Sequence, residues 1–314
     1  MDIIDKTSTP MGGRVLRRRL ILPLKNVNEI NRRLSLIEFF NKEDDLKFEI
    51  QSHLKSISDL DRLMGKLAAE KLSPKELGYL RQSLVAIKSI KEKLHPHHEV
   101  LAWLNPLNDL TDLIDFLNNH LNDELPVHLS KGNVIREGVD EELDRLRSLQ
   151  SSGKEFLDAM CQREIENTGI TSLKIDFNNV FGYYIEVRNT HKDKVPADWI
   201  RKQTLVSAER YITEELKEYE TQILGAEEKI AALEHRLYRA VCENVMNYID
   251  AIQENAQLIA QLDIAVGLSE LAISEGYTKP VLNEGYAIDL KEARHPIIEK
   301  ALPLAKSISR MIFT

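Results

Sequence analysis

The sequence predicts a mainly α fold: a multi-helix bundle extends a long antiparallel helical arm, and the arm carries a small antiparallel β domain at its tip. Apolar and polar residues alternate from Leu173 to Val187 around the turn signal Asn178-Asn179, which indicates a β-hairpin. On both sides of this hairpin the apolar residues recur at helical spacing. Aromatic residues make up only 6% of the chain, which agrees with long helices and a small β component.

The two stretches that flank the hairpin predict the arm. Before the hairpin, apolar residues recur at three-to-four spacing from Val139 to Met160. After it, apolar residues repeat every seventh place, with a second set three places on: Leu216, Ile223, Ile230 and Leu237, then Tyr219, Ala226, Leu233 and Ala240. Each flank is therefore expected to be a helix with an apolar seam, and the two helices are expected to pack together. A third strand is expected near residues 201–208.

Helix-start signals predict the elements of the bundle. Thr9 can cap a helix that has Pro10 in its first turn and ends near residue 22. Ser73 and Glu76 flank Pro74 at capping-box spacing, which predicts a helix that ends near residue 94. Further helices are expected over residues 28–40, 44–54 and 59–67. The returning helix of the arm is expected to reach residue 274, and a strand is expected at residues 286–289.

The charge of the β domain differs from that of the rest of the chain. The 314 residues carry a net charge of −8, yet between residues 170 and 212 seven basic residues outnumber five acidic ones. A mildly basic tip on an acidic shaft predicts that the tip contacts an anion, and nucleic acid is the obvious one.

The chain shows no signal-peptide pattern and no run of eighteen apolar residues, so we expect a cytoplasmic protein with no membrane segment. Cys161 and Cys242 lie in helical stretches that are expected to place them far apart along the arm. We therefore expect two free thiols and no disulfide.

Four segments of the chain resemble the bacterial MutS family of DNA mismatch-repair proteins. They are TPMGGRVLRRRLILPL at residues 9–24, FGYYIEV at 181–187, RKQTLVSAERYITEELKEYE at 201–220 and ARHPIIE at 293–299. The resemblance implies a helical core and lever domain at residues 1–153 and 214–277, with a clamp domain at 154–213 inserted in the lever. It also implies that residues 278–314 begin a truncated ATPase domain. In this family the clamps of a homodimer close around double-stranded DNA, and a MutL-type protein is the repair partner.

The resemblance also implies DNA-binding residues within the clamp. The basic side chains would donate to phosphate oxygens, and the uncharged ones would make further backbone contacts. The expected residues are Asn178, Lys192, Lys194, Arg201, Lys202 and Ser207. The alternative for the four cations is a solvated polar face. For Asn178 it is turn chemistry, and for Ser207 it is local hydrogen bonding to the backbone.

Two motifs of the full-length family are absent from these 314 residues. No Phe is followed by Glu two places on, so the wedge that reads a mismatch is missing. No Gly-Lys is followed by Ser or Thr, so the Walker A phosphate loop is missing as well. We therefore expect no catalytic residues, no ATPase activity and no cofactor in this chain, with ATP and Mg²⁺ implied for the family's ATPase domain.

Two rival functions follow from other features. The chain could be a coiled-coil interaction module whose β tip binds a protein partner, in which case binding would not fall steeply with salt. It could also be a hydrolytic enzyme that uses His95, His97 and His98, but these lack Cys or acidic partners at metal-ligand spacing.

Strand alternation places Tyr183 in the small core and only Tyr184 outward, which favours core packing over base stacking.

Overall fold

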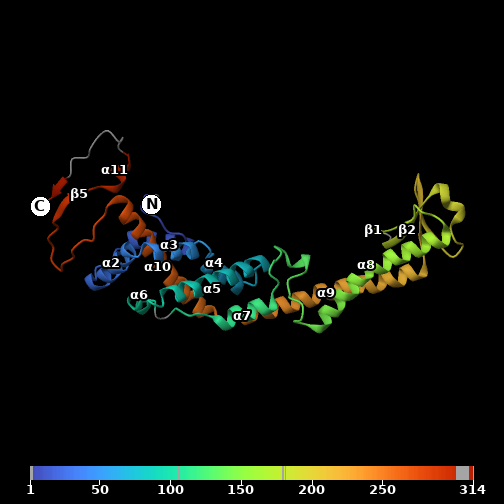
Figure 1. The fold of residues 1–314 in the computed structure, drawn as a ribbon, viewed down its shortest axis with the longest axis horizontal. Coiled ribbons are helices and arrows are strands. Elements are labelled where there is room, and N and C mark those ends of the chain that lie inside the picture. The colour runs from blue at the N-terminus through green and yellow to red at the C-terminus, as the bar shows by residue number, and fades with distance from the viewer. Residues whose placement is uncertain (1–2, 105–106, 179, 181, 302–310, 314) are drawn as a thin grey trace. The chain divides into compact units, whose positions relative to one another are not determined.

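The chain folds into two compact units, which the computed structural model describes over residues 3–104, 107–178, 180, 182–301 and 311–313 (Figure 1). One unit comprises residues 1–118 and 242–314, and the other comprises residues 119–241. Helices dominate both units, and the second contains a small antiparallel sheet, as the sequence predicts.

The first unit is built around one long apolar helix. Its elements are α1 (Pro10–Ile21), α2 (Val27–Lys42), α3 (Asp44–Leu54), α4 (Leu60–Ala68), α5 (Pro74–Leu94), α6 (His98–Trp103), α7 (Thr111–His120), α10 (Ile249–Glu275), β5 (Leu290–Ala293), α11 (Pro296–Ala301) and β6 (Met311–Phe313). Helix α10 packs against α1, α2, α3 and α4. Ile252, Ile259 and Leu262 of α10 are fully buried, so this helix forms the centre of the unit.

By length and composition alone, α10 could cross a membrane, and it is the one such helix among the residues described. Two-thirds (67%) of its most apolar window is buried within the unit. Central helices of water-exposed bundles pass the same test, because a helix that is apolar all round is also what a protein core requires.

Local capping signals fix the helix starts where the sequence predicts them. The Thr9 hydroxyl accepts a hydrogen bond from the Gly12 N–H at 3.0 Å at the start of α1. Ser73 and Glu76 form the reciprocal capping box at the start of α5. These bonds satisfy backbone donors that have no partner inside the helix, which is why the signal can be recognised in the sequence.

A buried carboxylate docks the start of α1 onto α10. Asp263 accepts hydrogen bonds from the backbone N–H groups of Ser8 and Thr9, each at 2.8 Å, and from the Thr9 hydroxyl at 2.7 Å. Burial raises the pKa of this carboxyl. A Cβ at Gly12 would lie 2.2 Å from Asp263 Oδ2, so the glycine is required by the close approach of the two helices.

The second unit is a helical pair that ends in the sheet. It contains η1 (Leu129–Lys131), α8 (Glu141–Thr168), β1 (Lys174–Asn178), β2 (Gly182–Arg188), η2 (Asn189–Lys194), β3 (Ile200–Thr204), β4 (Ala208–Ile212) and α9 (Glu214–Met246), the last turn of which belongs to the first unit. Asp140 caps the start of α8, and Gly169 ends it in the left-handed conformation, with φ 66°. Helices α8 and α9 lie side by side and the strands lie at their end (Figure 1).

The predicted apolar seam of α9 is correct over two repeats and then drifts. Leu216, Ile223 and Ala226 are buried, but Ile230 and Leu237 are only half-buried and Ala240 is exposed. The buried positions farther along α9 are Glu234, Tyr238, Val241 and Val245. A straight α-helix drifts about 20° per heptad relative to a 3.5-residue repeat, so the buried face moves to the neighbouring position.

Three boundaries differ from the sequence prediction. One strand was expected at residues 201–208, but this segment holds β3 and the start of β4, with a turn between them. The returning helix breaks near Asn247 and Tyr248, before α10 begins. The strand expected at residues 286–289 lies instead at Leu290–Ala293, where it pairs antiparallel with β6.

Candidate nucleic-acid interface

The sheet of the second unit has the strand order β1-β2-β4-β3, and all its pairs are antiparallel. One face carries the apolar residues that the alternation predicts and packs on the end of α8 and the start of α9. The buried cluster consists of Met160, Ile170, Leu173, Ile185, Val187, Trp199, Tyr211 and Leu216. The sheet therefore has its own core.

A carboxylate of α9 holds the start of β2. Glu220 Oε2 accepts a hydrogen bond from the Tyr183 N–H at 3.1 Å. Gly182 has φ +77°, and a Cβ there would lie 2.1 Å from Glu220 Oε1. The glycine is needed both for its backbone conformation and for this approach. Tyr183 lies between Phe177 and Tyr219, at ring-centroid distances of 5.0 and 5.7 Å, which anchors the sheet on the arm.

The predictions that Tyr183 packs on the core and that Tyr184 lies on the other face are both confirmed, and neither ring is free to stack on a base. Tyr184 lies on the opposite face of the sheet but is only 5% exposed. The Arg210 guanidinium covers it, 4.2 Å from the ring centroid, and also donates to Glu186 at 3.1 Å and to Gln203 at 3.0 Å. This polar cover could not be read from alternation alone, because it requires side chains from three strands.

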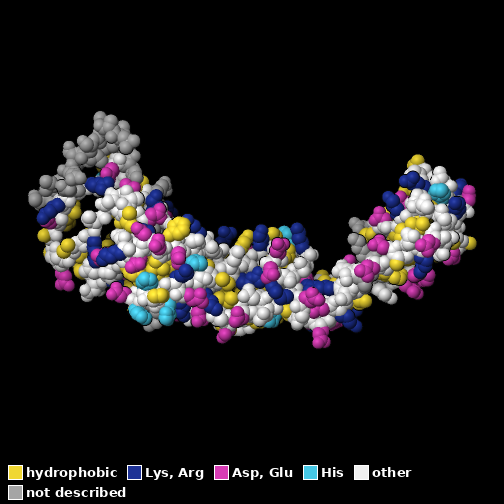
Figure 2. Space-filling view, viewed as in Figure 1, with side chains coloured by type: hydrophobic (Ala, Val, Ile, Leu, Met, Phe, Trp, Pro, Cys, Tyr) yellow, Lys and Arg dark blue, Asp and Glu magenta, His cyan; other side chains and the backbone are white. Residues whose placement is uncertain are grey.

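The four cations expected to bind DNA are all exposed. Lys192 and Lys194 lie in η2, and Arg201 and Lys202 lie in β3, which is an edge strand. A β-bulge falls between Arg201 and Gln203, where the extra residue is Lys202. Basic and acidic side chains are interspersed at the sheet end of this unit (Figure 2). We refer to Lys192, Lys194, Arg201 and Lys202 as the four cations.

Glu209 lies beside two of the four cations. Its Oε1 accepts a hydrogen bond from Arg201 Nη1 at 3.3 Å, and its Oε2 accepts one from the Tyr211 hydroxyl. The Tyr211 hydrogen bond lowers the pKa of Glu209, and Arg201 and Lys192 lower it further. Burial, together with Glu209, raises the pKa of Tyr211 to about 12. The arrangement is an ionised carboxylate between a buried phenol and exposed cations.

Ser207 lies in the turn between β3 and β4, beside the start of η2. The Asn189 N–H donates to the Ser207 carbonyl at 3.1 Å, and Asn189 Nδ2 donates to the Val206 carbonyl at 3.0 Å. The Ser207 residue is exposed, and Val206 is fully exposed. The structure therefore brings the Ser207 turn next to the helix that carries Lys192 and Lys194.

Asn178 lies apart from this group. It is at the end of β1, opposite Gly182, whereas Ser207 lies beyond the Arg188 end of β2. The two ends of this seven-residue strand are about 20 Å apart. Asn178 Oδ1 accepts a hydrogen bond from the Val180 N–H at 2.8 Å, which is the turn chemistry that was the alternative to a DNA contact.

Sequence reasoning did not single out Glu209, Tyr211 or Asn189. Residues two places apart in a strand share a face, so Glu209 and Tyr211 could have been paired once β4 was recognised. Because β4 was not predicted as a separate strand, this spacing was not recognised. Asn189 gave no signal, because its contacts are with a turn seventeen residues away.

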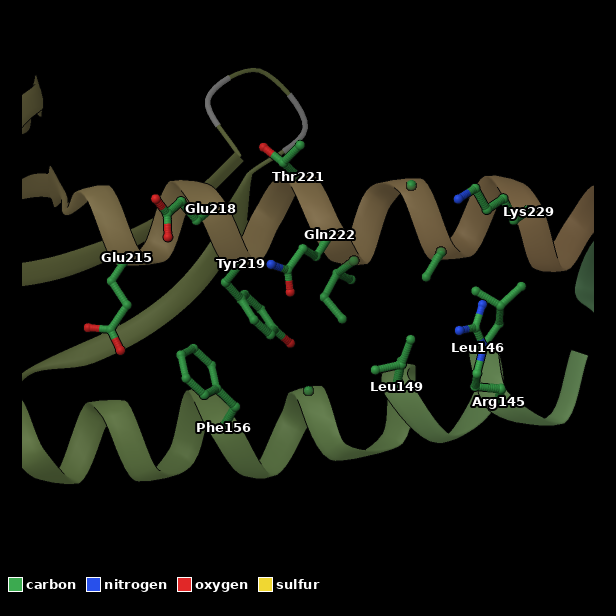
Figure 3. Close-up of a pocket in the computed structure, with 14 residues that line it drawn as sticks. Arg145, Leu146, Leu149, Phe156, Glu215, Glu218, Tyr219, Thr221, Gln222 and Lys229 are labelled. Atoms are coloured by element: carbon green, nitrogen blue, oxygen red, sulfur yellow. The ribbon is translucent and has the colours of Figure 1, made fainter. Parts of the chain in front are cut away.

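A crevice of about 680 Å³ lies between α8 and α9 (Figure 3). Phe156 and Tyr219 stack across it, with ring centroids 4.9 Å apart and an angle of 20° between the rings. Its lining mixes apolar residues with charges of both signs, including Arg145 and Glu218. Within the described part of the chain no group of three or more His, Cys, Asp or Glu residues could hold a metal ion, and the His95 to His98 segment forms no such group.

Comparisons with known proteins point to one family. The family model for MutS domain III matches residues 1–269. The DNA mismatch repair protein MutS of Flavobacterium psychrophilum is 52% identical over 306 residues, which cover 97% of this chain and 35% of that protein. The proteins of the same name from Flavobacterium johnsoniae and Christiangramia forsetii are 51% and 50% identical, with 97% and 96% of this chain covered and 35% of each protein. The chain thus spans about a third of the length of these relatives.

Proposed function

Because this chain belongs to the MutS family, we propose that it supplies the core, lever and clamp of a DNA mismatch-repair protein and holds double-stranded DNA by its backbone. The observation that carries the proposal is the set of four exposed cations on the edge strand and η2 of a small sheet, in a chain whose net charge is −8. Lys and Arg that contact phosphates position a protein on a duplex but carry no sequence information.

The wider role rests on the family alone. We propose that residues 154–213 act as the clamp, that residues 278–314 begin an ATPase domain, and that the lever couples the two. A homodimer and a MutL-type partner are proposed on the same ground. The 314 residues contain no Walker A loop, so none of them is assigned to ATP or Mg²⁺, and no catalytic role is proposed for this chain.

Titration of matched and mismatched duplexes over a range of salt concentrations tests the proposal. Non-specific affinity is expected at Kd of about 10⁻⁴ to 10⁻⁶ M near physiological salt, with no preference for the mismatch. Arg201→Ala combined with Lys202→Ala should weaken binding to both duplexes alike. If both side chains neutralise phosphates, the slope of log affinity against log salt should become shallower by about 1.8.

Lys55→Ala combined with Lys71→Ala is the matched control, because both lysines are exposed and belong to the first unit. This variant should keep the slope of the unchanged protein. Binding that is insensitive to salt would contradict the proposal and favour the protein-interaction module. A clear preference for the mismatched duplex would also contradict it, because contacts to the DNA backbone alone do not distinguish the two duplexes.

A further inference from the structure

An acidic side chain occupies the proposed phosphate-binding surface and holds one of its cations. We propose that Glu209 competes with DNA phosphate for Arg201 and so limits the affinity of the clamp for duplex DNA. The inference rests on the proposed function, since it concerns the regulation of that same surface. Glu209 itself need not touch DNA.

The pair is asymmetric in its exposure. The Glu209 side chain is 12% exposed, whereas the Arg201 side chain is 60% exposed. A ligand that approaches from solvent therefore meets the guanidinium first. Arg201 donates a single hydrogen bond to Glu209, at 3.3 Å, and a guanidinium has five N–H donors in all. The pair in the free protein thus leaves Arg201 with donors that a phosphate can use.

The acidic partner is fixed and the basic partner can move. Tyr211 donates to Glu209, is 6% exposed and packs against Trp199 in the core of the sheet, at a ring-centroid distance of 6.0 Å. Glu209 also lies opposite the buried Val187 in the register of β2 and β4. Arg201, by contrast, comes from an edge strand next to a β-bulge. A phosphate would draw Arg201 away from Glu209 while the Glu209–Tyr211 pair stays in place.

Glu209 carries its negative charge at neutral pH, because the Tyr211 hydrogen bond and the nearby cations lower its pKa. An ionised carboxylate beside Arg201 and Lys192 offsets part of the positive charge that attracts DNA. The carboxylate therefore reduces duplex affinity in two ways: it occupies a donor of Arg201, and it repels phosphate.

A similar pair on the opposite face of the same sheet provides the matched control. Glu186 accepts from Arg210 at 3.1 Å, but the Arg210 side chain is only 19% exposed. Arg210 is further held by Gln203 and lies over the Tyr184 ring. Loss of the Glu186 charge should therefore leave Arg210 in its place, on the face of the sheet opposite to Arg201 and Glu209.

The experiment compares Glu209→Gln with Glu186→Gln in the full 314-residue chain, using duplex DNA titrations between about 50 and 200 mM salt. Glu209→Gln keeps an oxygen acceptor and removes the charge. It should tighten duplex binding by about two- to fivefold at the lower salt, and steepen the salt slope by up to about 0.9. Glu186→Gln should change neither quantity. Circular dichroism at the titration temperature establishes that both variants are folded.

A double-mutant cycle tests whether the effect passes through Arg201. In an Arg201→Ala background, most of the gain from Glu209→Gln should disappear, because the competed side chain is gone. An undiminished gain would show that Glu209 acts by general repulsion alone, and would overturn the inference.

The remaining outcomes separate this inference from the proposed function. If the unchanged chain binds duplex DNA with a steep salt slope but Glu209→Gln leaves binding unchanged, the inference is wrong and the proposed function stands. Weaker binding by Glu209→Gln would mean that Glu209 orients Arg201 for phosphate instead of competing for it. A chain that shows no salt-dependent binding at all would remove the proposed function and the inference together.

Discussion

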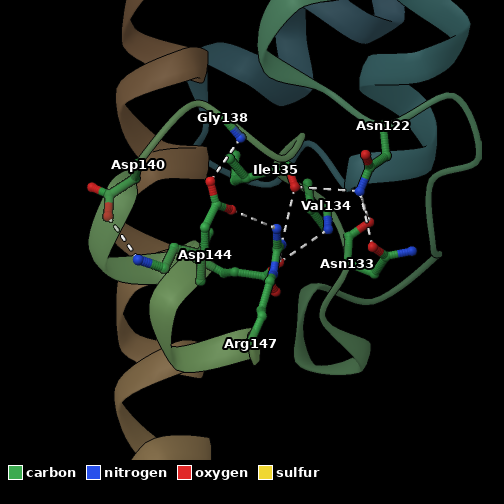
Figure 4. A network of polar contacts seen from close by, with 10 residues as sticks. Asn122, Asn133, Val134, Ile135, Gly138, Asp140, Asp144 and Arg147 are labelled. Atoms are coloured by element: carbon green, nitrogen blue, oxygen red, sulfur yellow. Dashed lines mark hydrogen bonds and ion pairs between the residues drawn. The ribbon is translucent and has the colours of Figure 1, made fainter. Parts of the chain in front are cut away.

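At the scale of single residues, buried carboxylates determine how loops attach to helices. Glu234 of α9 is 1% exposed, and its Oε1 accepts hydrogen bonds from Arg147 of α8 and, at 3.2 Å, from the Val134 N–H. Arg147 also donates to the Ile135 carbonyl at 3.0 Å (Figure 4). One acidic residue thus joins both arm helices to the loop that precedes α8.

Removal of Glu234 should be costly. Glu234→Ala leaves the Arg147 guanidinium, 24% exposed, and the buried Val134 N–H without this acceptor. We expect the free energy of unfolding to fall by about 2–4 kcal/mol, measured by urea denaturation. The control is Glu227→Ala on the same helix, where the exposed carboxylate accepts from the exposed Gln150 and the expected cost is below about 0.5 kcal/mol. Equal effects of the two changes would show that Glu234 is not a structural centre.

Tyr211 should make stability depend on pH in the alkaline range. Its pKa in the folded chain is raised to about 12, so the folded state binds this proton more tightly than the unfolded chain does. Its contribution to stability is therefore present below about pH 10 and is lost as pH rises through about 12. Between about pH 9.5 and 11.5 the melting temperature of Tyr211→Phe should therefore fall less than that of the unchanged chain. Parallel losses in the two proteins would contradict the assignment.

At the scale of elements, two helical glycines in the arm have opposite surroundings. A Cβ at Gly153 of α8 would lie 2.3 Å from the Tyr219 hydroxyl oxygen and 2.8 Å from Ile223 Cδ1. A Cβ at Gly225 of α9 would meet nothing within 4 Å. Both glycines cost helix stability relative to Ala, but only Gly153 is required by the packing of the helical pair.

The two glycines give a matched prediction. Gly225→Ala should raise the free energy of unfolding by about 0.5–1 kcal/mol, because Ala favours the helix and fits the space. Gly153→Ala should lower it by about 1–3 kcal/mol, because the new methyl group displaces Tyr219 from its stacking on Phe156. Thermal or urea unfolding measures both. A higher free energy of unfolding for Gly153→Ala would contradict the prediction, because it would mean that α8 and α9 can move apart at this position at little cost.

The residues of α9 that are buried also depend on the helix as a whole. A seven-residue repeat in the sequence predicts Ile230 and Leu237 on the buried face, but both are half-buried, and Glu234 and Tyr238 are buried instead. The sequence shows which residues are apolar. The pitch of the helix and the path of its partner decide which of them meet that partner.

At the scale of the whole molecule, charge is the property most visible in the sequence. A net charge of −8 disfavours contact with DNA over most of the surface, and under the proposed function the four cations are where contact is expected. Their exposure agrees with that interpretation, although Arg201 already has an acidic partner. The charge count alone could not reveal this pairing, because Glu209 lies eight residues away and belongs to a strand that the sequence analysis missed.

The sequence by itself determined the helix starts, the β1–β2 hairpin and the family of the chain. These depend on groups that lie within a few residues of one another, such as the Thr9 and Ser73 caps, or on long motifs such as residues 201–220. The local signal is complete in such cases, because the bonded partners are neighbours in the chain.

Only the tertiary structure decided which side chains meet. It joined Asp263 to Thr9, placed Arg201 on Glu209, and put Asn178 and Ser207 near opposite ends of one strand. The physical reason is that strand register and helix packing set these distances, and a shift of one residue moves a strand's side chains to the other face. The residue types of the candidate interface could therefore be predicted, whereas its grouping and its acidic competitor could not.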